Sequence, residues 1–175
     1  MKEFENLVHR THRTGLKVII DFVPKSRSTP ISLGCTTGTV RPNWELTMTP
    51  AKSFSPYNNF YYIPQAELHA QFDMKDGAAE PYREFPAKAT GNNRFDATPN
   101  ITDWYETVKL KLWSGLSEWR YLPLLPRLRD TWIKMLDILL FWASKDIDGF
   151  RCDMAEMVPV EFWEWAIPQV KRGLS

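Results

Sequence analysis

The distribution of apolar and polar positions predicts a helix followed by a buried strand near the start of the chain. Residues 2–14 place apolar side chains on one face at helical spacing, and Gly15 follows at the position where helices commonly end. Residues 17–23 (KVIIDFV) then form a nearly continuous apolar run, which Pro24 ends. Such a run is typical of a strand buried on both faces of a parallel sheet. This order predicts half of a repeating α/β unit.

The same order recurs towards the other end of the chain. Residues 130–145 carry apolar side chains at helical spacing, and residues 149–153 (GFRCD) predict a second strand after a short turn. A last helix is predicted to begin near Pro159, and we expect Pro168 to kink it or end it early. The predicted order is therefore helix, strand, long insertion, helix, strand and helix, which indicates the α/β class.

The insertion between the two predicted strands has about a hundred residues, whereas connections in α/β units usually have about 2–6. Its middle, residues 54–108, is rich in aromatic and turn-forming residues and predicts a loop-rich subdomain. Residues 25–52 and 110–129 show neither a period nor helix caps. They are either irregular loops or stretches translated out of frame.

These patterns divide the chain into three parts. Residues 1–24 form a helix and strand, residues 25–128 form the inserted subdomain, and residues 129–175 form a helix, a strand and a following helix. The inserted subdomain is expected to contain both irregular stretches almost entirely.

Composition narrows the classes of function. The formal net charge is +1, so no strong field points to nucleic acid or to a membrane surface. No apolar run approaches the roughly 20 residues that span a bilayer. Cys35 and Cys152 are too far apart for a metal-binding spacing. Met1 leads directly into an amphipathic segment, so no signal peptide is expected in this chain, and the localisation of a longer parent chain stays open.

Two strand ends carry residues with possible chemistry. Asp21 lies near the carboxyl end of the first apolar run, where it either caps a neighbouring loop or faces an active site. Arg151 and Asp153 lie two residues apart in the second strand, so their side chains point to the same side. A guanidinium beside a carboxylate favours the ionised form that a glycosidase nucleophile needs, although a purely structural ion pair has the same spacing.

Together the two motifs resemble the α-amylase family, glycoside hydrolase family 13. The first conserved region of that family is a buried strand that ends in Asp, two or three apolar residues and Pro, matched here by residues 21–24 (DFVP). The second reads Gly-Phe-Arg-x-Asp-x-Ala, matched in full by residues 149–155. Residues 12–15 (HRTG) and the long insertion also fit the family pattern.

The resemblance implies a fold and three residue roles. The fold would be the third and fourth βα units of a (β/α)₈ TIM barrel, with a loop-rich subdomain inserted between them. Asp153 would be the nucleophile, Arg151 would orient it, and Asp21 would support the site. The expected substrate is an α-glucan oligo- or polysaccharide.

The chain also departs from the family pattern. Lys25 and Ser26 stand where the family has Asn and His. The family's Asn is a calcium ligand, and an ammonium group cannot coordinate a cation, so we expect the calcium site to be lost and no cofactor in this chain. The general acid Glu of the fifth strand and the second Asp of the seventh have no counterpart here.

These features predict an internal fragment of a retaining α-glucan-active glycoside hydrolase that is inactive as this chain alone. The alternative is a non-catalytic protein that keeps the α-amylase fold for binding or as a partner subunit. The exact glucan, the linkage, the choice between hydrolysis and transfer, the oligomeric state and the parent length are not encoded in these motifs. His9, His12 and His69 form neither a metal spacing nor a catalytic triad, and we interpret His9 and His12 as helix-surface residues.

Overall fold

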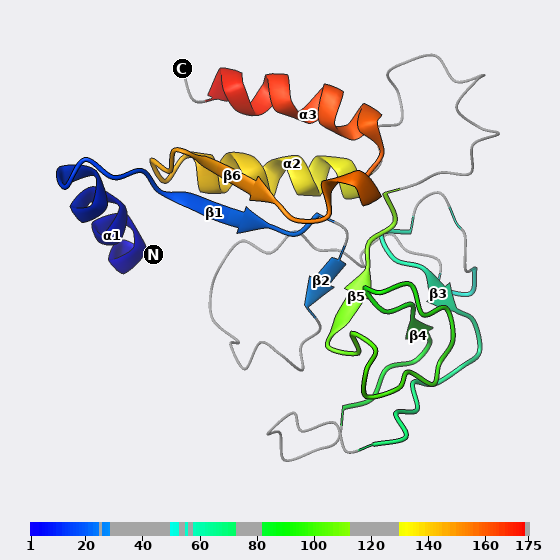
Figure 1. Ribbon diagram of the computed structural model, residues 1–175. Helices are drawn as coiled ribbons and strands as arrows, with labels where there is room; N and C mark the ends of the chain where they lie inside the picture. The colour runs from blue at the N-terminus through cyan, green and yellow to red at the C-terminus, as the bar shows by residue number, and fades with distance from the viewer. Residues whose placement is uncertain are drawn as a thin grey trace. The chain divides into compact units, whose positions relative to one another are not determined.

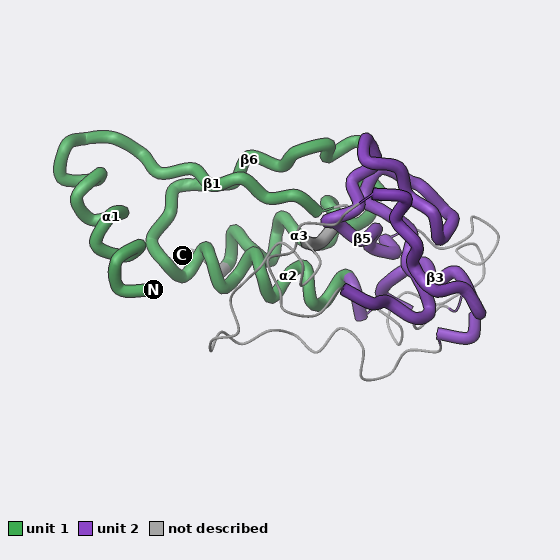
Figure 2. The backbone as a smooth tube through the Cα atoms, turned by 90° about the horizontal axis from the view of Figure 1, so that it is seen from below, with its two compact units in different colours: residues 1–24, 132–175 green, residues 25–131 purple. Residues whose placement is uncertain are grey.

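The computed structural model describes the following residues of the 175-residue chain: 1–24, 26–28, 50–52, 55, 58–72, 82–112 and 130–173. The chain forms two compact units, coloured separately in Figure 2. Unit 1 joins residues 1–24 to residues 132–175, and unit 2 consists of residues 25–131. Unit 1 is therefore built from the two ends of the sequence.

The centre of unit 1 is a pair of parallel strands that are far apart in the sequence. Strand β1 (Ile19–Phe22) lies beside β6 (Gly149–Cys152) in Figure 1. In the register of this parallel pair, Asp21 lies opposite Arg151. The residues predicted as strands, 17–23 and 149–153, thus contain adjacent parallel strands. The expectation that the first strand is buried on both faces is wrong, because Ile19 and Asp21 are exposed and only Phe22 is buried.

Helix α1 (Lys2–Arg13) ends in a Schellman motif. The backbone N–H of Gly15 donates to the His12 carbonyl at 2.9 Å, and that of Leu16 donates to the Thr11 carbonyl at 3.3 Å. Gly15 has φ +77°, a left-handed conformation that glycine adopts without a steric cost. This turn directs the chain from the helix into β1.

Helices α2 (Asp130–Ala143) and α3 (Val160–Gly173) pack together through aromatic rings. The ring centroid of Trp132 on α2 lies 5.6 Å from that of Phe162 and 5.8 Å from that of Trp165, both on α3. Trp132 and Phe162 are buried. A short 3-10 helix, η3 (Ala155–Met157), connects β6 to α3. Buried aromatic area of this kind is the main source of stability for a helix layer.

The expectation that Pro168 would end the last helix early, one of the two outcomes considered, is wrong. Helix α3 continues to Gly173, five residues beyond Pro168. Proline removes the hydrogen bond to the carbonyl four residues earlier, which here belongs to Glu164. Both Pro168 and Glu164 are exposed, so water can satisfy that carbonyl, while the buried face of the helix stays packed.

Unit 2 is built from loops and very short antiparallel strands. Strand β2 (Ser26–Ser28) pairs with β5 (Thr107–Lys109), and β3 (Tyr62–Ile63) pairs with β4 (Ala87–Lys88). Its buried apolar side chains include Phe60, Tyr62, Ala89, Val108 and Leu110. Aromatic and aliphatic burial, rather than regular structure, holds this unit together.

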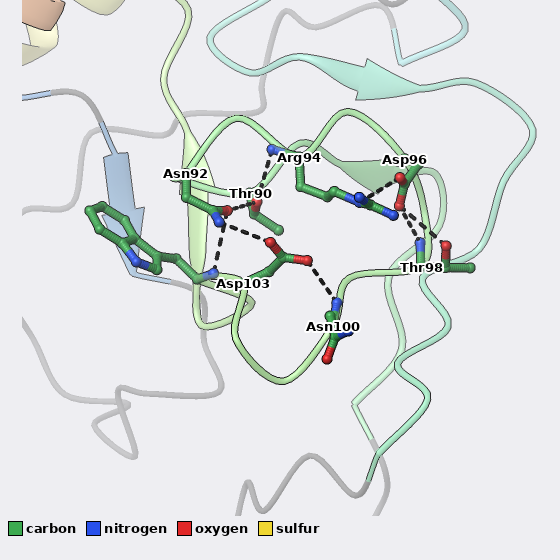
Figure 3. Close-up of polar contacts among 8 residues, drawn as sticks. Thr90, Asn92, Arg94, Asp96, Thr98, Asn100 and Asp103 are labelled. Carbon is green, nitrogen blue, oxygen red and sulfur yellow. Dashed lines mark hydrogen bonds and ion pairs between the residues drawn. The ribbon is translucent and has the colours of Figure 1, made fainter.

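A polar network organises the loop that precedes β5 (Figure 3). The side-chain amide of Asn92 donates to Asp103 Oδ1 at 2.9 Å, and the backbone N–H of Asn100 donates to Asp103 Oδ2 at 2.8 Å. The hydrogen bond from Asn92, followed by that from Asn100, lowers the pKa of Asp103. One carboxylate therefore joins the turn at Asn92 to the turn that contains Asn100 and Asp103 itself.

The two irregular stretches lie largely outside the described residues. Of residues 25–52 the structure describes 26–28 and 50–52, and of residues 110–129 it describes 110–112, where Leu110 and Leu112 are buried. The out-of-frame hypothesis stays a prediction. Within the described part of the chain, none of the helices has the length and apolar character needed to cross a membrane.

Candidate active site

The three site residues predicted from the sequence lie together in unit 1. Arg151 Nη1 donates to Asp21 Oδ2 at 2.8 Å, and Arg151 Nη2 donates to Asp153 Oδ1 at 3.1 Å. One guanidinium group therefore bridges two carboxylates that are 132 positions apart in the sequence. Because the interaction uses two different nitrogen atoms, it fixes the orientation of both acids relative to the cation.

Strand geometry explains how these side chains meet. Asp21 and Arg151 are paired in register, and Arg151 and Asp153 point to the same side because strand side chains alternate. The backbone N–H of Asp153 donates to the Phe22 carbonyl at 3.0 Å, which extends the hydrogen-bond ladder one residue beyond β6. Both carboxylates therefore lie at the same end of the strand pair.

The exposure of this cluster limits its contribution to stability. The side chains of Arg151, Asp21 and Asp153 are 65%, 59% and 38% exposed. Exposed ion pairs contribute about 0–1 kcal/mol to the free energy of unfolding. Stability alone is therefore a weak explanation for the cluster.

The arrangement leaves an oxygen atom available for chemistry. Among the described residues, no hydrogen-bond donor contacts the second carboxylate oxygen, Oδ2, of Asp153. Arg151 holds Asp153 through the other oxygen and compensates its charge. A carboxylate fixed in this way can attack an electrophilic carbon or stabilise a developing positive charge.

The support that follows Asp153 has no signal in the sequence. Met154 has φ 50° and ψ 43°, a left-handed conformation that is unusual for a residue other than Gly, Asn or Asp. The indole Nε1 of Trp163, on α3, donates to the carbonyl of Ala155 at 3.1 Å. No local sequence pattern signals this contact, because it depends on how α3 packs beside the loop.

A second polar cluster lies at the opposite end of the strand pair. Asp148 Oδ2 accepts a hydrogen bond from the backbone N–H of Val18 at 2.7 Å and lies 2.9 Å from His12 Nε2. The Val18 N–H, followed by His12, lowers the pKa of Asp148. The interpretation of His12 as a simple helix-surface residue is therefore corrected, since this side chain joins α1 to the start of β6.

The described residues contain no group of three or more His, Cys, Asp or Glu side chains that could hold a metal ion. Lys25, which replaces the family's calcium-binding Asn, lies outside the described residues, so loss of that site stays a prediction. Cys152 lies between Arg151 and Asp153 in the sequence, and burial raises the pKa of its thiol. A protonated, partly buried thiol is a poor nucleophile, which leaves the carboxylates as the reactive groups of this cluster.

Comparison with known proteins agrees with this geometry. The family described as "Alpha amylase, catalytic domain" matches residues 1–169. The chain belongs to the α-amylase catalytic-domain family. The fold of this family is a (β/α)₈ barrel, and the parallel pair of β1 and β6 is compatible with it.

Two maltosyltransferases match short segments of the chain. The chain is 39% identical over 46 residues to the alpha-1,4-glucan:maltose-1-phosphate maltosyltransferase of Rhodospirillum rubrum, a match that covers 26% of this chain and 7% of that enzyme. The enzyme of the same name from Picrophilus torridus is 42% identical over 41 residues, covering 23% of this chain and 6% of that enzyme.

A third relative matches most of the chain at lower identity. The amino acid transporter heavy chain SLC3A1 of Rattus norvegicus is 27% identical over 158 residues, which covers 90% of this chain and 19% of that protein. All three matches span less than a fifth of the relative's length. No solved structure matches the chain significantly.

Proposed function

We propose that this chain is part of a retaining α-glucan-active enzyme in which Asp153 is the nucleophile. The observation that carries the proposal is the guanidinium of Arg151 bonded to both Asp21 and Asp153 at one end of a parallel strand pair. In α/β barrels the active site lies at the carboxyl ends of the strands, which is where Asp153 follows β6.

The proposed chemistry is a double displacement. The free oxygen of Asp153 attacks the anomeric carbon of the sugar, and the bond from that carbon to the leaving oxygen breaks as the leaving oxygen takes a proton from a general acid. A covalent glycosyl ester forms on Asp153. A water molecule or an acceptor hydroxyl then attacks the same carbon, gives its proton to the general base and releases the carboxylate.

Each of the three residues has a separate role in this mechanism. Arg151 orients Asp153 before attack, and its charged hydrogen bond stabilises the carboxylate that is released afterwards. Asp21 anchors the other side of the guanidinium and supports the sugar subsite nearest the cut. Neutral hydrogen-bond donors in place of the guanidinium would orient Asp153 less strongly.

The mechanism also needs a second carboxyl group, about 5–5.5 Å from the nucleophile, as acid and base. The sequence contains no residue at the family position of that acid, so we infer that it comes from outside these 175 residues. The isolated 175-residue chain is then inactive. We assign its strands and helices to the third and fourth βα units of the barrel, with unit 2 as the inserted subdomain.

The choice between hydrolysis and transfer depends on what attacks the glycosyl ester. The names of the two maltosyltransferases describe transfer to an alpha-1,4-glucan, which supports an α-glucan as the substrate class of this chain. The ammonium group of Lys25 does not suit the position of a calcium ligand, so the proposed chemistry uses protein side chains alone.

The test is a pair of matched substitutions in the full-length chain that contains these residues. Asp153→Asn keeps the shape of the side chain and removes its charge, and we expect α-glucan cleavage or transfer to fall by at least about 10³-fold. Asp137→Asn, which changes an exposed carboxylate on α2, should leave activity unchanged. Reducing-sugar release and glucan chain length measure the two reactions. Activity that survives Asp153→Asn would rule out this nucleophile.

A second candidate function is a non-catalytic partner subunit. The match to a transporter heavy chain over 90% of the sequence favours it, because that relative covers both units whereas the maltosyltransferase matches cover about a quarter of the chain. This function predicts that the full-length chain has no glucan activity and binds a membrane transporter equally well with or without Asp153→Asn. Co-purification of the two variants with that transporter would separate the two functions.

A further inference from the structure

The sheet fixes the backbone that precedes Asp153 but not the backbone that follows it. Its N–H donates to the Phe22 carbonyl at 3.0 Å, so the preceding residues follow the ladder of β1 and β6. The next residue, Met154, leaves the sheet in the left-handed conformation. The orientation of the Asp153 side chain therefore depends on what holds Met154 and the residues that follow it.

The left-handed conformation of Met154 requires support from its surroundings. A side chain with a Cβ atom meets steric resistance at positive φ, and such residues persist only where neighbouring contacts determine the backbone. Local hydrogen bonds supply part of this support. The N–H of Met157 donates to the Met154 carbonyl at 3.0 Å, and the N–H of Val158 donates to the Ala155 carbonyl at 3.1 Å.

A contact from helix α3 completes the support of the Met154 backbone. Trp163 Nε1 donates to the same Ala155 carbonyl at 3.1 Å. The indole of Trp163 is half-buried and its ring centroid lies 5.0 Å from that of Phe162, whose side chain is fully buried. Since Phe162 packs on Trp132 of α2, the indole is attached to the rigid layer of two helices.

These contacts form a continuous path from the helix layer to the carboxylate. The layer holds Trp163, Trp163 holds the carbonyl of Ala155, and Ala155 is separated from Asp153 by one residue in a restricted conformation. We propose that Trp163 is a positioning residue that sets the orientation of Asp153 through Ala155 and Met154. This inference rests on the proposed function, in which Asp153 is the nucleophile.

The test uses Trp163→Phe, which removes the N–H donor and keeps an aromatic ring, in the full-length chain. We expect kcat for α-glucan turnover to fall by about tenfold, since a small displacement of a reacting group has effects of this order, with KM nearly unchanged. The matched control is Trp165→Phe on the same helix, whose ring packs on Trp132. It should reduce thermal stability at least as much and leave kcat near the original value.

Two substitutions of Met154 test the path without changing Trp163. Met154→Val disfavours the left-handed conformation, because a β-branched side chain is strongly resisted there, and should lower kcat in the same way. Met154→Gly adopts positive φ freely and, in the Trp163→Phe background, should restore part of the lost kcat. Hydrogen exchange at the amides of Met157 and Val158 should accelerate in Trp163→Phe and not in Trp165→Phe.

The outcomes distinguish this inference from the function on which it rests. If Asp153→Asn abolishes turnover but Trp163→Phe and Trp165→Phe have the same kcat, the positioning role is wrong and the nucleophile stands. A change confined to KM, or no recovery with Met154→Gly, would also overturn the positioning role. If the full-length chain is inactive or Asp153→Asn is fully active, the proposed function fails and this inference fails with it.

Discussion

Asp21 and Arg151 lie directly opposite each other on neighbouring parallel strands and are joined by a hydrogen bond of 2.8 Å between Asp21 Oδ2 and Arg151 Nη1. The two residues are separated by 130 positions, most of which belong to unit 2. The folding of unit 1 therefore assembles the candidate site from both ends of the chain.

Arg151→Lys tests whether the shape of the guanidinium matters as well as its charge. An ammonium group is a point charge and cannot reach two carboxylates through two fixed nitrogen atoms. We expect kcat/KM on an α-glucan to fall by about 10–100-fold in the full-length chain. The free energy of unfolding should change by less than about 1 kcal/mol, because the side chain is largely exposed. If the free energy of unfolding falls by as much as the activation free energy of turnover rises, Arg151 belongs to a structural ion pair instead.

Asp148 gives a prediction for the dependence of stability on pH. Its pKa is lowered in the folded chain, so the stability it contributes is present above the unfolded value of about 3.9 and is lost as pH falls through the lower folded value. The groups that face it are His12, Lys17 and the Val18 N–H, and Asp146 faces the other nitrogen of His12.

Asp148→Asn should therefore destabilise unit 1 at pH 7 and have little effect near pH 2. The measurement is hydrogen exchange at the Val18 amide, which should be faster in the variant at neutral pH. Asp146→Asn is the control, because its carboxylate is 72% exposed and makes a longer contact of 3.5 Å. An Asp148→Asn effect that is equally large at both pH values would show that the carboxylate charge is not what stabilises this end of the strands.

The strands and the side on which the carboxylates lie were predictable from the sequence because both depend on short periods, and the parallel pairing was expected because consecutive βα units place their strands side by side. The alternation of strand side chains places Arg151 and Asp153 on one side, and the apolar run before Asp21 identifies its strand. The contact between His12 and Asp148 joins positions 136 residues apart and has no local pattern. Its prediction requires the register of β1 and β6, which only the folded chain supplies.

The architecture of unit 2 was not predictable for a different reason. Strands β3 and β4 have two residues each, too few for an alternation to be visible in the sequence. The network around Asp103 consists of side-chain bonds to turns, which many Asn and Asp residues could form equally well. Aromatic content indicated a packed subdomain but did not specify its strand pairs.

The thiol of Cys152 provides a chemical test of the strand environment. Burial raises its pKa, so less of the reactive thiolate is present at a given pH than for a free cysteine. In a Cys35→Ser variant we expect alkylation by iodoacetamide at pH 8 to be several-fold slower in the folded chain than in the chain unfolded in urea. Alkylation at the same rate in both states would contradict this environment.

The nucleotide sequence can test whether residues 25–52 and 110–129 are translated out of frame. If residues 25–52 are translated out of frame, a shift of one nucleotide should yield Asn-His directly after Pro24, and a second shift should yield a regular continuation after Val108. The nucleotide sequence across both stretches decides this. If neither alternative frame restores the family pattern, the two stretches are loops of the natural protein.

The Asp148 contacts and the Arg151 contacts occupy opposite ends of the same short strand. Residues that secure the fold are thereby separated from the residues that we propose face a substrate. Substitutions around Asp153 that alter substrate preference then need not disturb the junction of α1 with β6. For protein engineering, unit 1 offers an end where the sequence can be diversified and an end that is best left unchanged. In evolution, the same separation would allow catalytic activity to be lost while the scaffold is retained.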